Sequence, residues 1–138
     1  MTEKPLPVVD PSTRPFWEAA KAHRLVLQRC RDCGTHIFYP RANCTACYSD
    51  RLEWKEAGGE GTVYSYTIAH RPAGPAFKED LPYVVAIIAL EEGPRILSNI
   101  VTKDMANAAA NVAIGSKVRV IFEDVTEEIT LPKFVLTA

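Results

Sequence analysis

The chain has 138 residues, of which 47% are hydrophobic and 24% charged, and these ordinary globular values exclude a largely disordered protein. Its formal net charge of −1 at pH 7 argues against a nucleic-acid-binding protein, because contacts to phosphates usually need a clear excess of cations. The sequence contains neither an apolar run of membrane-spanning length nor the apolar region of a signal peptide, so we expect a cytoplasmic protein.

The N-terminal segment, residues 1–12, is rich in proline and is expected to form an extended, partly disordered arm. A helix is predicted to follow over about residues 13–23, with a serine or threonine at its cap. Phe16, Trp17 and Ala20 would form one apolar face of this helix. We favour packing of this face on the rest of the protein; the alternative is packing on a partner, and exposed apolar surface here could also let the protein self-associate.

All four cysteines fall in two CxxC pairs, Cys30 with Cys33 and Cys44 with Cys47, and none is left for a disulfide elsewhere. A CxxC turn directs two sulfurs at one point, and two facing turns supply the four soft ligands of a tetrahedral zinc ion. Such a site is closed to substrate and is therefore structural. Zinc would stabilise a ribbon too small to fold by its core alone, by about 10 kcal/mol in comparable peptides.

Two alternatives to zinc remain for the four cysteines, which together form a cage of sulfur ligands. One is iron, as in a rubredoxin-type electron carrier, and the other is a redox-active cysteine pair. Gly34 suits the left-handed conformation that often follows the first CxxC turn. Tyr48 stands at the equivalent position of the second turn, where many ribbons carry a second glycine. The second turn therefore departs from the usual ribbon pattern, whereas the set of four ligands does not.

The remaining pattern predicts a mainly β protein. Beyond a glycine cluster at 58–61, the five predicted strands have one helical stretch, at about 104–111, between the third and the fourth, which is the order of an OB-fold barrel. The continuously apolar run 83–90 is expected to be buried on both faces. We expect Tyr64 and Tyr66 to share one face. The predicted strands are 25–30, 35–40, 52–57, 61–70, 83–90, 95–101, 117–123 and 133–137.

The expected organisation thus has three parts. Residues 1–24 form an N-terminal arm and helix, residues 25–57 form the zinc ribbon, and residues 58–138 form a five-stranded OB-fold barrel. The glycine cluster between the second and the third part marks the change from the cysteine-bearing pattern to strands alone.

Several strings of this sequence carry a family resemblance: the double CxxC motif followed by Pro40-Arg41, the strand GTVYSYT with His70-Arg71-Pro72, and EEGPRILSN. Together they resemble a bacterial and archaeal family once catalogued as domain of unknown function thirty-five. The resemblance extends over residues 13–134. It implies a helical arm, a rubredoxin-like zinc ribbon and a C-terminal OB-fold.

The resemblance also implies a function. Members of this family are encoded beside thiolases or thiolase-like lipid-transfer proteins, and several form complexes with them. They are thought to help bind acyl-CoA or to hold a larger assembly in place. By resemblance, we expect a non-catalytic accessory subunit of lipid metabolism, with zinc as its cofactor and a thiolase-like protein as its partner.

The sequence itself shows no recognisable catalytic motif, neither a GxSxG elbow nor a P-loop, a dinucleotide fingerprint or HExxH. His70 could act as a base or bind a CoA phosphate, but a loop-anchoring hydrogen bond is the interpretation we favour. The long loop 71–82, with Phe77 expected to be exposed, is a candidate partner or ligand loop, or a connection stiffened by its prolines.

A CoA site needs a few cations at one end and an apolar groove at the other. The sequence offers one candidate set, on the ribbon and the barrel, although each residue alone is more simply a solvated side chain. The set consists of Arg29, Arg31, Phe38, Tyr39, Arg41, Arg71 and Lys78.

The alternative function is binding of single-stranded nucleic acid, because zinc ribbons and OB-folds both often do this. Tyr64 and Tyr66 could then form a stacking platform, although filling the barrel face is the simpler role. The net charge and the scattered cations argue against nucleic acid.

Overall fold

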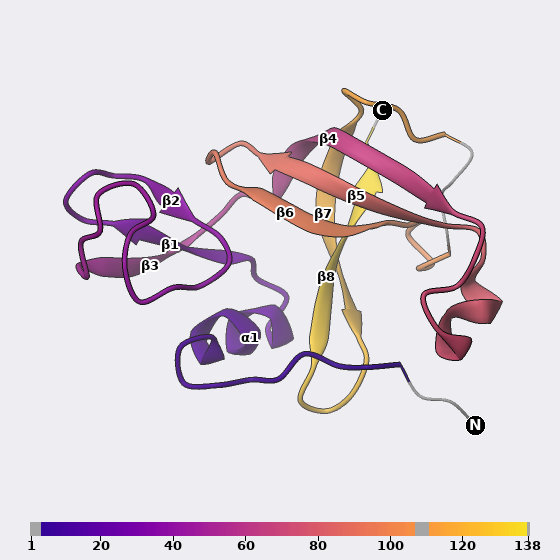
Figure 1. The fold of residues 1–138 in the computed structure, drawn as a ribbon, viewed down its shortest axis with the longest axis horizontal. Coiled ribbons are helices and arrows are strands. Elements are labelled where there is room, and N and C mark those ends of the chain that lie inside the picture. Colours follow the sequence, from indigo (N-terminus) through magenta and orange to yellow (C-terminus); the bar gives the residue numbers. More distant parts are fainter. Residues whose placement is uncertain (1–3, 107–110, 138) are drawn as a thin grey trace.

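The computed structural model describes residues 4–106 and 111–137. A small three-stranded ribbon lies at one end, a closed five-stranded barrel at the other, and one helix packs between them (Figure 1). The mainly β fold class and the OB-fold barrel are confirmed. The elements are α1 Arg14–Lys21, β1 Val26–Cys30, β2 His36–Ile37, β3 Leu52–Glu56, β4 Glu60–Ala69, the 3-10 helix η1 Pro75–Asp80, β5 Tyr83–Leu90, β6 Arg95–Ile100, β7 Lys117–Asp124 and β8 Thr130–Leu136.

The ribbon sheet has the order β2-β1-β3, with β1 antiparallel to both neighbours. The strand predicted over 35–40 is only two residues long, because Phe38 and Tyr39 leave the sheet and pack their rings against Phe16. This departure places the aromatic residues of the ribbon directly under the helix.

The barrel has the order β4-β5-β6-β8-β7, and its closing pair, β6 with β8, is parallel and pairs only Ile100 with Phe134. β8 begins at Thr130, three residues before the predicted start at Lys133. The helical stretch predicted at 104–111 lies partly outside the described residues, and its described part, 104–106 and 111, contains turns and a bend and no helix.

A bulge in β4 corrects the expectation that Tyr64 and Tyr66 share a face. The register against β5 shifts between Val63 and Ser65, so the inserted Tyr64 points outward while Val63 and Tyr66 both pack in the core. Tyr64 is 49% exposed and lies against Arg95, whose guanidinium carbon is 3.8 Å from the ring centroid. A stacking platform of the two tyrosines is therefore not formed.

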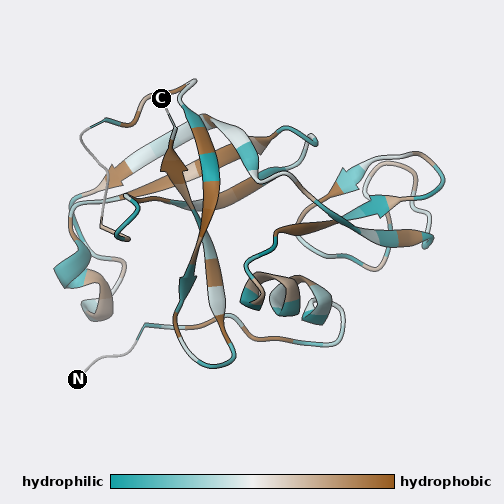
Figure 2. Cartoon of the chain, turned by 180° about the vertical axis from the view of Figure 1, so that it is seen from behind, coloured by the Kyte–Doolittle hydropathy of each residue, from teal (hydrophilic) through white to brown (hydrophobic). Residues whose placement is uncertain are grey.

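β5 is fully buried along its inner face but only partly buried along its outer face, apart from Tyr83, whereas the apolar run predicted burial on both. Its inward residues, from Val84 to Leu90, are 0–3% exposed, whereas the outward Val85 and Ile87 are half-buried. Figure 2 shows barrel strands that carry both hydrophobic and hydrophilic residues, whereas the sequence of β5 is apolar throughout. The outward apolar residues of β5 are therefore partly shielded from solvent by parts of the chain that lie outside the barrel.

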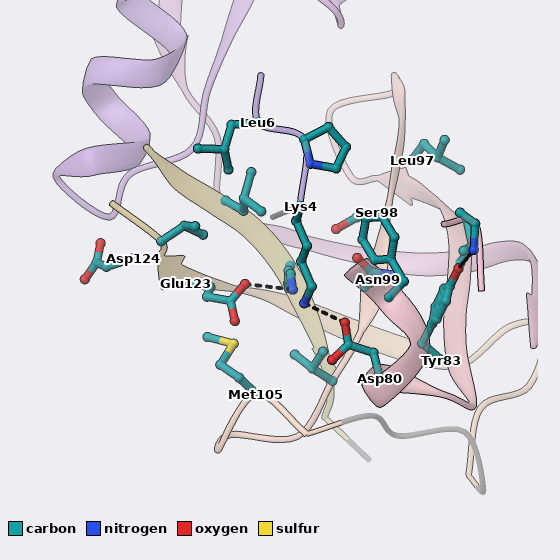
Figure 3. A pocket seen from close by; sticks show the side chains of 18 residues that line it. Lys4, Leu6, Asp80, Tyr83, Leu97, Ser98, Asn99, Met105, Glu123 and Asp124 are labelled. Atoms are coloured by element: carbon teal, nitrogen blue, oxygen red, sulfur yellow. Dashed lines mark hydrogen bonds and ion pairs between the residues drawn. The ribbon is translucent and has the colours of Figure 1, made fainter. Parts of the chain in front are cut away.

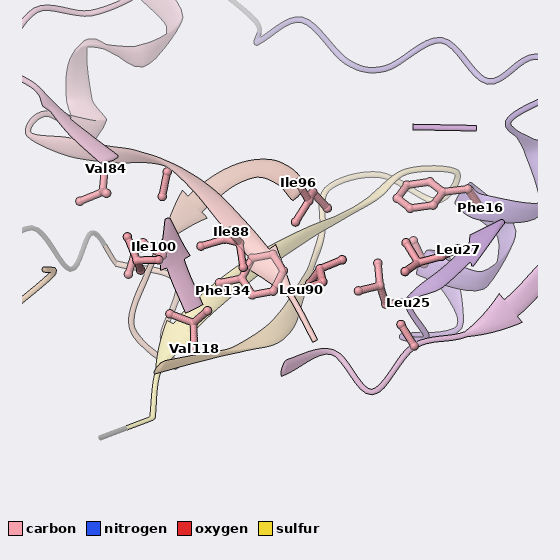
Figure 4. Close-up of a cluster of buried hydrophobic side chains, with 14 of the residues drawn as sticks. Phe16, Leu25, Leu27, Val84, Ile88, Leu90, Ile96, Ile100, Val118 and Phe134 are labelled. Atoms are coloured by element: carbon pink, nitrogen blue, oxygen red, sulfur yellow. The ribbon is translucent and has the colours of Figure 1, made fainter. Parts of the chain in front are cut away.

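One apolar core joins the helix, the base of the ribbon and the barrel (Figure 4). Phe16 and Trp17 of α1 are only 2% and 7% exposed, and they pack with Leu25 and Leu27 against barrel side chains. The apolar face of the helix is thus packed within the chain, as the favoured prediction stated. It offers no exposed surface for self-association.

Polar contacts fix the end of α1 on the β7–β8 hairpin. Lys21 donates to the carbonyl of Thr126 at 2.7 Å, and the His23 ring, stacked on Phe122, contacts Asp124 at 3.0 Å. A hydroxyl hydrogen bond from Thr130, together with His23, lowers the pKa of Asp124 and keeps it ionised. The helix is thus attached to the barrel by both apolar and charged contacts.

The connection from ribbon to barrel is pinned on both sides. The N–H of Ala57 donates to Leu25 at 2.8 Å, and the N–H of Val120 donates to Gly59 at 2.7 Å. Gly59 has φ +81°, and a Cβ there would meet Val120 at 2.5 Å, so only glycine fits. The connection between the ribbon and the barrel is therefore closely packed and fixed by hydrogen bonds.

Replacing Phe16 with alanine is expected to destabilise the whole chain by about 3–5 kcal/mol, because the ring is buried in the shared core. The measurement is urea unfolding followed by circular dichroism. Val8→Ala, at a side chain 82% exposed, is the control and should change stability little. If Phe16→Ala loses little stability and the unfolding transition of the barrel is unchanged, the helix is not part of the barrel core.

Candidate functional site

The four cysteines meet at one point of the ribbon. Cys30 ends β1, and all four Sγ atoms lie within 4.8 Å of one another. The sulfurs of Cys30 and Cys47 are 3.6 Å apart, as are those of Cys33 and Cys44. Cys30 and Cys44 are buried, and Cys33 and Cys47 are exposed. Four sulfurs in this arrangement fit a tetrahedral metal ion.

The two turns that present the sulfurs have the same backbone form. In the first, the N–H of Gly34 donates to Cys30 at 2.9 Å, and in the second, the N–H of Tyr48 donates to Cys44 at 3.0 Å. Gly34 has φ +78° and Tyr48 has φ +65°, so the tyrosine adopts the conformation that glycine prefers. The departure at Tyr48 therefore leaves the turn intact.

Backbone hydrogen bonds within the turns favour thiolates, the form that ligates metals. The backbone N–H of Cys33 lowers the pKa of Cys30, and hydrogen bonds from Thr35 lower the pKa of Cys33 to about 6. The backbone of Ser49 favours the Cys47 thiolate, but the other sulfurs raise the pKa of Cys47 to about 12. Mutual repulsion thus opposes four thiolates, and a divalent cation would remove that repulsion.

Polar side chains join the two turns beside the cage. The Ser49 hydroxyl donates to one oxygen of Asp32 at 2.5 Å, and Arg51 pairs with the other oxygen at 3.3 Å. Asp32 lies between the first two ligands and Ser49 follows the last. These contacts hold the two turns in register around the sulfurs.

Two of the three ribbon cations proposed for CoA are paired with an acidic side chain. Arg29 and Arg31 both pair with Glu53, at 3.2 and 3.5 Å. Arg41 is exposed, and its backbone is fixed by two hydrogen bonds with the Gln28 side chain, at 2.7 and 2.9 Å. The ribbon arginines therefore do not converge on one anion site.

The aromatic residues proposed for the same groove belong to the helix contact. Phe38 is half-buried, with its ring centroid 5.5 Å from that of Phe16. The Tyr39 hydroxyl accepts a hydrogen bond from the Trp17 indole at 3.0 Å. A partner could reach Phe16 or Trp17 only by displacing the helix.

The barrel residues proposed for the groove lie far from the ribbon. His70, Arg71 and Lys78 are exposed in and before the loop 71–82, at the end of the barrel opposite the ribbon (Figure 1). The structure therefore does not bring the two halves of the proposed CoA groove together. Phe77 was expected to be exposed, but it is half-buried, and its ring centroid is 6.1 Å from that of Tyr83.

Sequence reasoning missed a cavity of about 660 Å³ on the barrel (Figure 3). Its walls come from the N-terminal arm, the loop 71–82, the strands β5 and β6, and the β7–β8 hairpin. The unbroken apolar run of β5 was the available signal, because its outward residue Val85 lines this cavity. No helix in the described part of the chain is both long and apolar enough to cross a membrane.

Two family models match this chain. Residues 17–53 match the ChsH2 rubredoxin-like zinc ribbon domain, and residues 54–123 match the ChsH2 C-terminal OB-fold domain. The chain belongs to the ChsH2 family. The family assigned from the sequence motifs is confirmed, since relatives carry the name DUF35 domain-containing scaffold protein.

The relatives include proteins of about the same length as this chain and proteins that are much longer. A DUF35 domain-containing scaffold protein of Methanothermobacter thermautotrophicus is 34% identical, over 85% of each chain. A probable enoyl-CoA hydratase alpha subunit of Thermomonospora curvata is 40% identical over 95% of this chain, which spans 39% of that protein. The 3-oxo-4,17-pregnadiene-20-carboxyl-CoA hydratase alpha subunit of Mycobacterium tuberculosis is 35% identical over 79% of this chain and 33% of its own length.

Two solved structures share the fold. A chain of the Ltp2-ChsH2(DUF35) aldolase superposes with a TM-score of 0.80 and 39% identity, covering 95% of this chain and 98% of that one. A DUF35-family protein of Sulfolobus solfataricus gives a TM-score of 0.64 at 19% identity, covering 92% of this chain and 86% of that one, and shows the fold alone. The chain is thus similar, over nearly its whole length, to a chain of the structure described as the Ltp2-ChsH2(DUF35) aldolase.

Cys44→Ser is expected to abolish metal binding, because the remaining three sulfurs cannot close the cage. Zinc and iron bound per chain are measured by plasma mass spectrometry after gel filtration. Thr45→Ala, an exposed change within the same turn, should keep about one equivalent of metal, the amount expected for the native chain. A full equivalent of metal in Cys44→Ser would show that the ion is bound elsewhere.

Tyr48→Gly is expected to stabilise the metal-bound ribbon by about 1 kcal/mol, because glycine relieves the cost of a left-handed tyrosine. The side chain is 81% exposed, so little packing is lost. Gly34→Ala at the matching position of the first turn should destabilise it by a similar amount. Thermal unfolding at saturating metal measures both changes, and a loss of stability for Tyr48→Gly would contradict this account.

Proposed function

We propose that the chain is a non-catalytic scaffold subunit that docks on an enzyme of the thiolase superfamily and helps hold an acyl-CoA substrate in the assembly. The observation that carries the proposal is the superposition of 95% of this chain on 98% of a chain from the structure described as the Ltp2-ChsH2(DUF35) aldolase. The family resemblance supplies the thiolase-like character of the partner. The scaffold name of three relatives supports the same role.

The acyl-CoA component rests on the names of two longer relatives, which are alpha subunits of hydratases, one of them for a named CoA ester. Because the predicted cation groove is not assembled within this chain, we infer that a CoA would be held jointly with the partner. Arg41, Arg71 and Lys78 are exposed and could each contribute one cation at such a joint surface.

All four cysteines of the sequence belong to the cage, which leaves no thiol for catalysis. We infer that the bound metal is zinc, held by the four thiolates. Zinc supplies no redox chemistry and, with four protein ligands, no open position for substrate. Its role here would be to fix the shape of the ribbon that the partner recognises.

The proposal is tested by purifying the tagged chain from an extract of its source cells and identifying the proteins that elute with it by mass spectrometry. We expect a thiolase-superfamily protein in near-equal amount, held through gel filtration. The tag alone is the control. If no member of that superfamily is recovered in repeated purifications at low salt, the scaffold proposal is wrong for this protein.

A further inference from the structure

The cavity on the barrel lies where OB-folds take their ligands. It crosses the outer face of β5 and β6, the second and third strands of the barrel, and extends over the parallel seam to β8. The loop 71–82 lies at one end, and Val125, which opens the β7–β8 loop, lies at the other. These correspond to the strands and loops that OB-folds commonly use for binding.

The lining is mainly apolar, and its charges compensate one another. Lys133 contacts Glu123 at 2.8 Å, and Lys4 pairs with Asp80 (Figure 3). Among the described residues that line the cavity, no cation remains in excess for a phosphate, which argues against nucleotides and nucleic acid at this surface. The apolar part of the lining includes Leu6, Tyr83, Val85, Leu97, Met105 and Leu131.

Neutral polar groups add a small capacity for hydrogen bonding. The Asn99 amide nitrogen donates to the carbonyl of Val84 at 2.7 Å, which leaves the amide oxygen as an acceptor. The Tyr83 hydroxyl accepts from the N–H of Ala73 at 3.1 Å, which leaves its O–H as a donor. One neutral donor and one neutral acceptor suit a hydroxyl or a carbonyl group on a ligand.

The N-terminal arm covers this cavity and is held weakly. Lys4 pairs with Asp80 and lies over the Phe77 ring, 5.5 Å from its centroid, so both contacts reach the same loop. The Lys4 and Asp80 side chains are 48% and 36% exposed, and ion pairs this exposed contribute little. Among the described residues, no backbone hydrogen bond joins 4–9 to a barrel strand. The arm can therefore move without unfolding the barrel.

We propose that this cavity binds an uncharged, mainly apolar small molecule carrying a hydroxyl or carbonyl group, and that residues 4–6 close over it as a strap. A volume of about 660 Å³ lies within the range of small-molecule sites. The site is independent of the scaffold proposal, since it uses neither the ribbon nor a partner.

The test uses the full chain and Nile red, an uncharged apolar dye with a ring carbonyl whose emission rises on binding. The native chain should bind one equivalent saturably. Val85→Trp fills the cavity and should weaken binding by about tenfold or more. Ile87→Trp is the matched control, since Ile87 is equally half-buried on the same face of β5 but does not line the cavity.

Lys4→Ala provides a second test if Val85→Trp fails to fold. Releasing the strap should speed dye dissociation several-fold in stopped-flow measurements, whereas Lys55→Ala on the ribbon should not. The proposal is overturned by unsaturable dye binding, by equal loss in the two tryptophan variants, or by equal dissociation in the two lysine variants. Displacement of the dye by CoA or by a single-stranded oligonucleotide would overturn the uncharged class of ligand.

Discussion

The convergence of four thiolates on one point is the constraint on which the ribbon depends. Apart from the cysteines, the small cluster inside the ribbon contains little more than Ile37 and Leu52. So few apolar contacts cannot offset the entropy of ordering the ribbon. We infer that a metal ion would supply the missing free energy, and the two turns, joined through Asp32 and Ser49, are arranged to accept it.

The rest of the chain has a different source of stability. The helix, the base of the ribbon and the barrel share one apolar core, in which Phe16 and Phe134 are the largest fully buried side chains. Loss of the metal would thus unfold the ribbon tip first, while the strands of the barrel retain their own packing. The chain joins a metal-dependent module to a core-dependent one through a single helix.

Sequence patterns predicted these two modules well, because each has a local signal: cysteine spacing for the cage and alternation for the strands. They failed where the signal was interrupted or non-local. The extra residue at Tyr64 reversed the alternation of β4, which no period-two pattern reveals. For the proposed CoA groove, closeness in sequence did not reveal that Arg29 and Arg31 pair with one shared acid, Glu53. The cavity was missed because four distant segments build it.

The ribbon begins after Leu25 and ends before Ala57, and these two residues are hydrogen-bonded to each other. Leu27, Phe38 and Trp54 still pack in or against the shared core, so only the cysteine-bearing tip beyond them is an excursion whose base is fixed. Segments anchored in this way tolerate insertion and exchange, because the rest of the fold contacts only their fixed ends. Evolution could therefore remodel the ribbon tip to suit different assemblies while the barrel and its cavity stay unchanged.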